Sequence, residues 1–277
     1  MIHIGIIGGG FVGSATNLLN CPEKGIKSII YDIEFKKCIP PLTTLDDIIR
    51  CDVIMIAVPT PMNKDGSCNT NIVEKVINQV KELNRDAFII IRSTVPVGFC
   101  ERMNVSFMPE FLTEANWRND FLNCKEWIFG LVEKDKKYKE PLEMLFNIRF
   151  GEVECKFITP SEAELIKYFR NCFLSVKVSF CNEIYSFCQA LNINYDNVIN
   201  IAANNDKRIG SSHTKVPGPD KFFGYGGTCF PKDMHSLEFQ MKQQNINSSI
   251  ISASIYRNEN IDRTEKDWEN DTGRAVV

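Results

Sequence analysis

An apolar segment that ends directly in a glycine-rich turn limits most strongly how this chain can fold. Residues 2–7 read IHIGII, which is typical of a buried strand, and Gly8, Gly10 and Gly13 follow with the spacing G-x-G-x-x-G. The first glycine permits a tight turn, the second lets a pyrophosphate approach the backbone, and the third lets a helix pack on the strand. The N–H groups at the start of that helix favour phosphate. The pattern predicts a dinucleotide site formed by Gly8, Gly10, Phe11, Val12 and Gly13.

The end of the second apolar segment indicates which dinucleotide binds. The sequence SIIYD places Asp32 at the end of a predicted strand. A carboxylate at this position accepts hydrogen bonds from the ribose hydroxyls and repels a 2′-phosphate. We therefore expect NAD rather than NADP. The alternative for Asp32 is a surface residue that caps a turn.

Strand and helix patterns alternate through the first part of the chain. Short apolar segments lie at 28–31, 52–58, 88–91, 105–108 and 127–132. Helices are expected at 70–83, which is amphipathic, and at 135–148, and a last edge strand is expected at 154–158. This alternation is typical of an α/β fold whose parallel sheet is covered on both faces. It predicts a Rossmann-type NAD-binding domain over residues 1–158.

The pattern changes at Pro160. No turn residue interrupts 160–191, which predicts one long helix. Further helices are expected at 195–203, 232–244 and 247–265, with a loop at 204–228 that is rich in Gly, Pro and Asn. Residues 159–265 are thus predicted to form an all-helical domain with a long central helix. The polar segment 266–277 is expected to be a loose tail.

Composition excludes several classes of function. The net charge of −3 gives no general attraction to nucleic acid or to membranes. No apolar segment approaches the roughly 20 residues that span a bilayer, and the N-terminus lacks the features of a secretory signal. The eleven cysteines are scattered, without CxxC or Cys/His spacing, so neither a zinc site nor a disulfide framework is expected. The expected location is the cytoplasm, with no metal cofactor.

The segment GYGGTCFPKD, residues 224–233, is the most informative for chemistry. Three glycines and a proline surround Cys229, and Lys232 and Asp233 follow it. A thiolate adds to an aldehyde, and the adduct loses a hydride to become a thioester, which allows an alcohol to be oxidised beyond the aldehyde. Neighbouring charges favour thiolate character. An isolated cysteine is more often buried and structural, but this glycine-rich setting favours a nucleophile.

Seven motifs in order make the chain similar to a known family. They are GIIGGGFVG, VPTP at 58–61, STVPVG at 93–98, PEFLTEA at 109–115, EAELIKYFRN at 162–171, DKRIG at 206–210 and GYGGTCFPKD. In these residues the chain resembles the UDP-glucose/GDP-mannose dehydrogenase family. The resemblance implies NAD-dependent oxidation of the primary alcohol of a nucleotide-sugar to a carboxylate in two steps, with UDP-glucose favoured.

The resemblance also implies roles for matching residues. Cys229 is the expected nucleophile, and Lys167 and Asn171, four apart on one helix, are expected to stabilise oxyanions. Asp233 and Thr94 are expected to hold the catalytic water. Glu110 is the expected general acid–base group. Alternatively, Lys167 and Asn171 lie on a solvated helix face.

Binding roles follow in the same way. The predicted cofactor-binding residues, besides the glycine turn and Asp32, are Val58, Pro59, Thr60, Ser93, Thr94, Glu114 and Lys232. The predicted substrate-binding residues are Glu110, Phe111, Leu112, Lys167, Asn171, Arg208, Lys215, Tyr225 and Gly226. For Glu114 and Lys232 a role as plain surface charges stays open.

The resemblance further implies a homodimer that forms through the long helix, which makes residues 159–265 a dimerisation domain. Arg208 is expected to reach the sugar bound to the neighbouring subunit. Typical members continue into a second nucleotide-binding domain, and we expect this chain to lack it. We hypothesise that the loop at 211–223 partly replaces that domain, because aromatic rings stack on a base and cations neutralise a diphosphate. The loop offers His213, Lys215, Lys221, Phe222 and Phe223.

Three alternatives remain at this level. The catalytic motifs do not name the sugar, so GDP-mannose or a UDP-N-acetylhexosamine is an alternative substrate. A second alternative is a degenerate binding subunit without turnover, which the retained catalytic set disfavours. A single-step β-hydroxyacid dehydrogenase shares the expected fold, but it gives no reason for the Cys229 loop.

Overall fold

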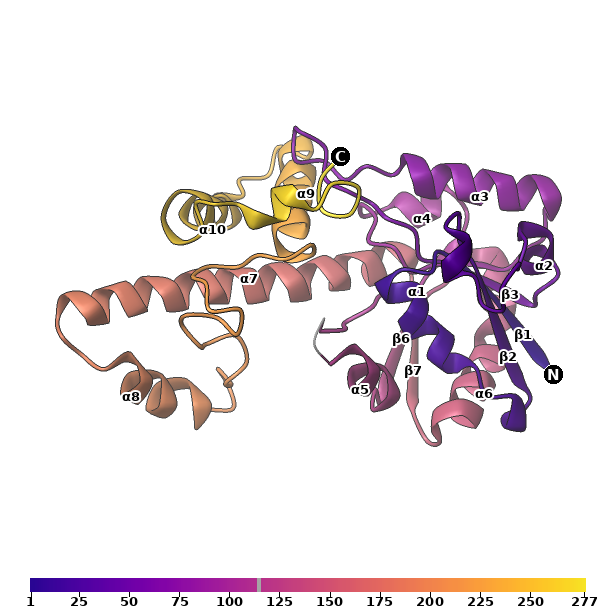
Figure 1. Ribbon diagram of the computed structural model, residues 1–277, viewed down its shortest axis with the longest axis horizontal. Coiled ribbons are helices and arrows are strands. Elements are labelled where there is room, and N and C mark those ends of the chain that lie inside the picture. Colours follow the sequence, from indigo (N-terminus) through magenta and orange to yellow (C-terminus); the bar gives the residue numbers. More distant parts are fainter. Residues whose placement is uncertain (114–115) are drawn as a thin grey trace. The chain divides into compact units, whose positions relative to one another are not determined.

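The computed structural model describes residues 1–113 and 116–277. The chain, drawn as a ribbon in Figure 1, forms two compact units. Unit 1 contains Met1–Thr60 and Asn69–Lys167, and unit 2 contains Pro61–Cys68 and Tyr168–Val277. The two units meet in sequence inside a helix, whereas the domain boundary at residue 158 stays a prediction.

Unit 1 is built on a seven-stranded sheet. The strands are β1 (Ile2–Ile7), β2 (Ile26–Tyr31), β3 (Val53–Ile56), β4 (Ile89–Ile91), β5 (Ser106–Phe107), β6 (Glu126–Gly130) and β7 (Glu154–Ile158). Their order is β2-β1-β3-β4-β5-β6-β7. Strands β1 to β5 pair in parallel, β6 runs antiparallel to β5, and β7 is parallel to β6. The predicted α/β class and the edge strand are confirmed, while the reversal at β6 departs from a wholly parallel sheet.

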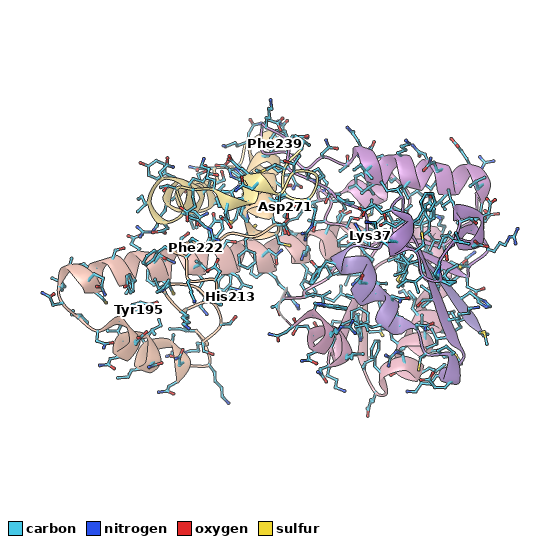
Figure 2. All side chains as sticks on the ribbon, in the orientation of Figure 1. Lys37, Tyr195, His213, Phe222, Phe239 and Asp271 are labelled. Carbon is cyan, nitrogen blue, oxygen red and sulfur yellow. The ribbon has the colours of Figure 1, made fainter. Side chains whose placement is uncertain are left out.

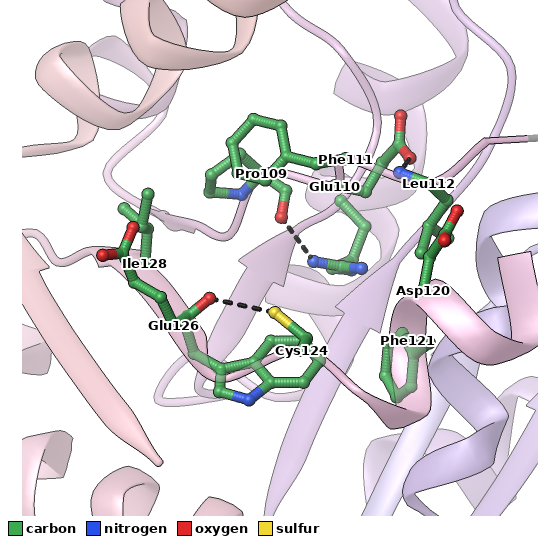
Figure 3. A pocket seen from close by; sticks show the side chains of 11 residues that line it. Pro109, Glu110, Phe111, Leu112, Asp120, Phe121, Cys124, Glu126 and Ile128 are labelled. Carbon is green, nitrogen blue, oxygen red and sulfur yellow. Dashed lines mark hydrogen bonds between the residues drawn. The ribbon is translucent and has the colours of Figure 1, made fainter. Parts of the chain in front are cut away.

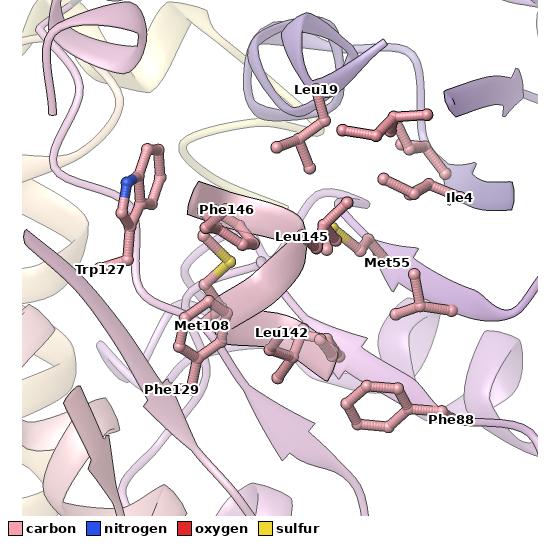
Figure 4. Close-up of a cluster of buried hydrophobic side chains, with 14 of the residues drawn as sticks. Ile4, Leu19, Met55, Phe88, Met108, Trp127, Phe129, Leu142, Leu145 and Phe146 are labelled. Atoms are coloured by element: carbon pink, nitrogen blue, oxygen red, sulfur yellow. The ribbon is translucent and has the colours of Figure 1, made fainter. Parts of the chain in front are cut away.

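The strands read as continuous apolar segments because both faces of the sheet are buried. Successive residues of β3 join different hydrophobic clusters, with Met55 in one and Ile54 in the other. The first cluster also holds Phe146 of α6 (Figure 4), and the second holds Ile77 of α3. The helices of unit 1 are α1 (Phe11–Thr16), α2 (Leu45–Ile49), α3 (Asn71–Leu83), α4 (Phe99–Arg102), α5 (Trp117–Leu122) and α6 (Lys139–Phe150).

Unit 2 is helical. Helix α7 (Pro160–Ala190) begins in unit 1 and continues through unit 2, which confirms the long helix that the sequence predicts. It is followed by α8 (Tyr195–Ile199), α9 (Phe230–Gln243) and α10 (Ser249–Arg257), with π-helical turns at Asn200–Asn204 and Asn258–Asp262. Tyr168 and Cys172 of α7 pack with Tyr225 and Met234 in the core of this unit.

The prediction of a loose tail is wrong. Trp268 and Ala275 are only 3% and 2% exposed. Met62 donates its N–H to the Ala275 carbonyl at 2.8 Å, and Val277 donates to the Met62 carbonyl at 3.0 Å. Thus the tail pairs with residues 61–68. A tryptophan inside an otherwise polar segment is the sequence signal for this packing.

None of the helices within the described ranges combines the length and the hydropathy that crossing a membrane requires.

Candidate active site

The predicted cofactor residues of unit 1 gather at one edge of its sheet. Parallel strands β1 to β4 end at that edge, with Ile7, Tyr31, Ile56 and Ile91. Ligands of open α/β sheets bind at the carboxyl ends of the strands, where the strand order reverses on the two sides of β1. The residues that follow these ends are Gly8, Gly10, Asp32, Val58, Pro59, Thr60, Ser93 and Thr94. Ser93 fixes two of these ends, since its hydroxyl donates to the Val58 carbonyl at 2.7 Å.

The glycine turn has the geometry that a diphosphate needs. Gly8 has a φ of +102°, and a Cβ there would lie 2.4 Å from the Ala57 carbonyl oxygen. A Cβ on Gly13 would lie 1.8 Å from the Gly8 carbonyl oxygen, so the helix that starts at Phe11 packs closely on β1. At Gly10, by contrast, no atom lies within 4 Å of an added Cβ. Because two glycines seal the turn and Gly10 leaves its backbone open, these residues fit the pyrophosphate of NAD.

Asp32 lies beside this turn. Its Oδ2 accepts a hydrogen bond from the Gly9 N–H at 2.6 Å, and its Oδ1 accepts from the Glu34 N–H at 2.8 Å. Lys37, labelled in Figure 2, forms an ion pair with Glu34 at 2.5 Å. A Cβ added to Gly9 would lie 2.8 Å from the Cβ of Lys37, so the turn packs closely against this residue. The position of Asp32 at the end of β2 therefore fits a ribose-binding carboxylate.

A buried ion pair joins Glu110 and Lys167. Lys167 Nζ donates to Glu110 Oε1 at 2.5 Å and to the Glu110 carbonyl at 2.8 Å. The Leu112 N–H donates to Glu110 Oε2 at 3.0 Å. The Lys167 ammonium also lies 5.9 Å from the centre of the Phe111 ring. Both side chains are almost fully buried, at 4% and 6% exposure.

This environment controls the charge of Glu110. Burial raises its pKa, but the charge and hydrogen bond of Lys167, the Leu112 N–H and the charge of Arg92 lower it, and the net shift is downward. Glu110 is thus a carboxylate near neutral pH, which is the form that a general base needs.

Arg92 fixes the backbone just before Glu110. It is 2% exposed and donates to the Met108 carbonyl at 2.9 Å and to the Pro109 carbonyl at 2.9 Å. The bond to Pro109 is drawn in Figure 3. Together with Pro109 to Leu112, Arg92 lines a small cavity of about 50 Å³. Sequence reasoning missed Arg92, although an arginine directly after the apolar segment 88–91 is a usable signal.

The thiol of Cys229 lies at the start of α9. Cys229 is the N-cap residue of that helix, and the next residue but one is Pro231. Among the described residues, which include all eleven cysteines, Cys229 is the one classed as exposed, and none forms a disulfide. Its solvent access suits a nucleophile better than a structural thiol.

Two buried charges follow the thiol. Lys232 Nζ donates to Asp233 Oδ1 at 2.6 Å, and Asn171 Nδ2 of α7 donates to Asp233 Oδ2 at 2.6 Å. Burial lowers the pKa of Lys232, but Asp233 and the thiol groups of Cys68 and Cys229 raise it further, so the net shift is upward. Lys232 thus stays a cation close to the thiol and is not an isolated surface charge.

The predicted oxyanion pair takes separate partners. Lys167 and Asn171 lie one turn apart in α7, as expected. However, Lys167 donates to Glu110 in unit 1, and Asn171 donates to Asp233 in unit 2. The alternative of a solvated helix face is wrong for both, because they are 3% and 8% exposed.

The remaining substrate candidates lie in the loop before α9. Tyr225 is buried, Gly226 is half-buried, and Lys215 is exposed. Arg208 is 89% exposed and pairs with Asp206. Glu114 lies outside the described residues.

Two aromatic side chains of the loop at 211–223 pack against other parts of unit 2. Phe222 lies under the Arg263 guanidinium at 5.1 Å, and the rings of Phe223 and Tyr185 lie 5.6 Å apart. Burial and the charge of Lys177 lower the pKa of His213 (Figure 2), so this imidazole is neutral near pH 7. Lys215 and Lys221 are thus the stronger cationic candidates of the loop, and its role in binding a diphosphate stays a prediction.

Comparisons with known proteins agree with this arrangement. The model of the NAD binding domain of the UDP-glucose/GDP-mannose dehydrogenase family matches residues 41–148, and that of the family's central domain matches residues 161–260. A putative UDP-glucose 6-dehydrogenase of Bacillus subtilis is 31% identical over 93% of this chain and 68% of its own length.

Solved structures share the fold. A UDP-glucose dehydrogenase from Pyrobaculum islandicum has a TM-score of 0.82 at 24% identity, over 94% of this chain and 68% of that chain. A UDP-D-ManNAc dehydrogenase from Pyrococcus horikoshii has a TM-score of 0.77 at 22% identity, over 93% and 68%. The chain spans from about half to about two thirds of the length of the curated relatives that it matches.

Residues 41–148 of unit 1 thus match the NAD-binding domain of a dehydrogenase family, and the glycine turn and Asp32 stay the residues predicted to hold NAD. The chain belongs to the UDP-glucose/GDP-mannose dehydrogenase family. This finding confirms the predicted family, the fold, NAD as the cofactor and the class of enzyme.

Proposed function

We propose that the protein oxidises the primary alcohol of a nucleotide-sugar to a carboxylate in two NAD-dependent steps, through a thioester on Cys229. UDP-glucose, which gives UDP-glucuronate, is the favoured substrate because the curated relatives are named for it. The observation that carries the proposal is an exposed thiol at the start of α9, followed by a buried Lys232–Asp233–Asn171 network.

Overall, one primary alcohol, two NAD and one water give one carboxylate, two NADH and three protons. NAD, when bound at the glycine turn, accepts the hydride in each of the two oxidations. The alcohol first becomes an aldehyde, and the Cys229 thiolate adds to its carbonyl carbon to give a hemithioacetal. Loss of a second hydride converts this adduct into a thioester. Water then cleaves the carbon–sulfur bond, which releases the carboxylate and the free thiol.

The buried groups supply charge and proton transfer. The Lys167 ammonium and the Asn171 amide are assigned to the oxyanions that form at the reacting carbon, since both are donors with fixed partners. Glu110, which is ionised near neutral pH, is assigned to remove a proton from the attacking water. Asp233 and Thr94 are assigned to hold that water.

A count of NADH tests the thioester route. Wild-type protein is expected to form two NADH for each nucleotide-sugar consumed, whereas Cys229→Ser, which replaces the thiolate with a poor nucleophile, stalls before product release. One NADH per sugar in the wild type contradicts the route. Absence of turnover on UDP-glucose, GDP-mannose and UDP-N-acetylhexosamines favours a binding subunit instead.

The same panel of substrates settles the sugar. We expect the largest kcat/KM with UDP-glucose. A larger kcat/KM with GDP-mannose or a UDP-N-acetylhexosamine reassigns the substrate but leaves the thiol chemistry intact.

The proposed partner, apart from the substrate, is a second copy of this chain. Helix α7 carries five exposed apolar side chains at helical spacing: Leu165, Phe169, Phe173, Phe180 and Phe187. The exposed Leu191 continues the row directly after the helix. Such an apolar row is typical of an interface, and Phe169 and Phe173 already stack at 6.1 Å. We assign it to a homodimer. In that dimer Arg208, which is exposed, is available to the substrate of the neighbouring subunit.

A further inference from the structure

The segment that carries the Cys229 thiol is held by side chains that the sequence motifs do not include. Asn258, at the end of α10, is 1% exposed. Its Oδ1 accepts from the Tyr225 N–H at 2.8 Å, and its Nδ2 donates to the Tyr225 carbonyl at 2.9 Å. One amide group therefore satisfies both backbone groups of Tyr225, as a neighbouring strand would.

Asn258 is also packed closely against the backbone of Gly224. A Cβ on Gly224 would lie 2.3 Å from Asn258 Oδ1, so this glycine, with a φ of +65°, is required by the contact. The Gly224 N–H donates to Asn182 Oδ1 at 3.1 Å. Three backbone groups, the N–H of Gly224 and the N–H and carbonyl of Tyr225, are thus fixed upstream of the thiol.

Arg263 supports the next residue. It is 3% exposed, and its guanidinium would lie 2.4 Å from a Cβ on Gly226. The guanidinium is itself fixed, because it donates to Asp267 at 2.6 and 2.9 Å and to Asp220 at 2.7 Å. A planar group held by two carboxylates is a rigid surface. The backbone at Gly226 lies directly on it.

We propose that Asn258 and Arg263 are positioning residues that set the location of the Cys229 thiol by fixing the backbone from Gly224 to Gly226. This inference rests on the proposed function of Cys229 as the nucleophile. At Gly227, with a φ of +71°, no atom lies within 4 Å of an added Cβ, in contrast to the close packing at Gly224 and Gly226. Position matters because a misplacement of about 1 Å costs about 100-fold in the rate of a reaction between bound groups.

Asn258→Asp tests the two hydrogen bonds between the Asn258 amide and the backbone of Tyr225. The substitution keeps the shape, but it removes the donor to the Tyr225 carbonyl and places two oxygens opposite each other. We expect kcat with the nucleotide-sugar to fall about 10-fold to 100-fold, with a smaller change in KM. The rate at which iodoacetamide alkylates Cys229, followed by peptide mass spectrometry, is also expected to change by at least about threefold.

Asn260→Asp is the matched control. Asn260 lies in the same π-helical turn and donates to the Tyr256 carbonyl at 2.8 Å, but it is exposed. We expect this variant to keep the wild-type kcat and the wild-type alkylation rate. The buried cysteines report on general loosening of the fold, since their alkylation rises if Asn258→Asp merely unfolds unit 2.

Gly226→Ala tests Arg263 independently and serves if Asn258→Asp does not fold. The added Cβ displaces the backbone from the guanidinium, and the same loss of kcat is expected. Values of kcat and of Cys229 alkylation within twofold of wild type in both variants overturn the inference. If wild-type protein turns over no nucleotide-sugar, the proposed function fails, while the alkylation rates still decide whether Asn258 positions the thiol.

Discussion

At the scale of single residues, the buried Glu110–Lys167 ion pair affects the free energy of unfolding. Lys167→Met leaves the Glu110 carboxylate buried without its cation, and removal of one partner of a buried pair costs about 3–5 kcal/mol. In the wild type the lowered pKa of Glu110 stabilises the fold above its unfolded pKa, and this contribution is lost as pH falls through the folded pKa. We therefore expect the loss in urea unfolding free energy to be large at pH 7 and smaller in acid.

The double variant Lys167→Met/Glu110→Gln is the control for that experiment. It removes both charges, so it is expected to recover part of the stability that Lys167→Met loses at pH 7. Equal stability of the single and double variants contradicts an energetic role for the pair.

Glu164 is a second buried carboxylate that affects stability, and its pKa is shifted upward, opposite to that of Glu110. This fully buried carboxylate of α7 accepts from the N–H groups of Gly98 at 2.6 Å and Cys100 at 2.8 Å. Burial and the charge of Glu101 raise its pKa, these hydrogen bonds lower it, and the net value is about 7. A folded pKa above the unfolded one means that stability present below the unfolded pKa is lost as pH rises to about 7.

Glu164→Gln removes this pH dependence. The difference in unfolding free energy between Glu164→Gln and wild type is expected to shift in favour of the variant by up to about 3 kcal/mol between about pH 4 and pH 8. Urea denaturation at both pH values measures it. Parallel pH profiles for the two proteins contradict the raised pKa.

At the scale of elements, α7 carries the prediction about assembly. Phe173 and Phe180 lie in the exposed row of this helix, at 60% and 62% exposure. Burial of a phenylalanine in an interface contributes about 1.5–3 kcal/mol, and a two-fold axis uses each side chain twice. We expect Phe173→Glu/Phe180→Glu to raise the dimer dissociation constant by at least about 100-fold, as measured by light scattering.

Phe35→Glu is the matched control for the α7 row. Phe35 is 78% exposed but lies in unit 1, away from α7 in sequence, so its replacement is expected to leave association unchanged. Loss of association in Phe35→Glu, or its persistence in the α7 variant, contradicts the assignment of the interface.

The same scale shows what the sequence can and cannot predict. The long helix at 160–191 follows from the absence of turn residues and the first strand from a continuous apolar segment, and the structure has them at Pro160–Ala190 and Ile2–Ile7. Short helices such as α2 and α4 were not expected, because four or five residues contain too little of a helical period.

Buried polar groups were missed for another reason. Arg92 and Glu164 are charged residues whose burial depends on carbonyl and N–H groups distant in sequence. No local pattern predicts such partners. The prediction for Cys229, by contrast, rests on glycines and charges that are its neighbours in sequence.

Across the whole molecule, the eleven cysteines provide the last test. None of the eleven, all of which the structure describes, forms a disulfide; six are buried, four are of intermediate exposure, and Cys229 is exposed. Burial also raises the pKa of several other thiols, to about 11 in Cys51 and Cys155, which lowers their thiolate fraction near neutral pH.

Native protein is therefore expected to show one thiol per chain that reacts rapidly with a disulfide reagent, followed by slow reaction of the others. Cys229→Ser is expected to lack the fast phase, and urea is expected to expose all eleven thiols in the wild type. A fast phase that persists in Cys229→Ser shows that another cysteine is the reactive one and removes the basis for a thioester on Cys229.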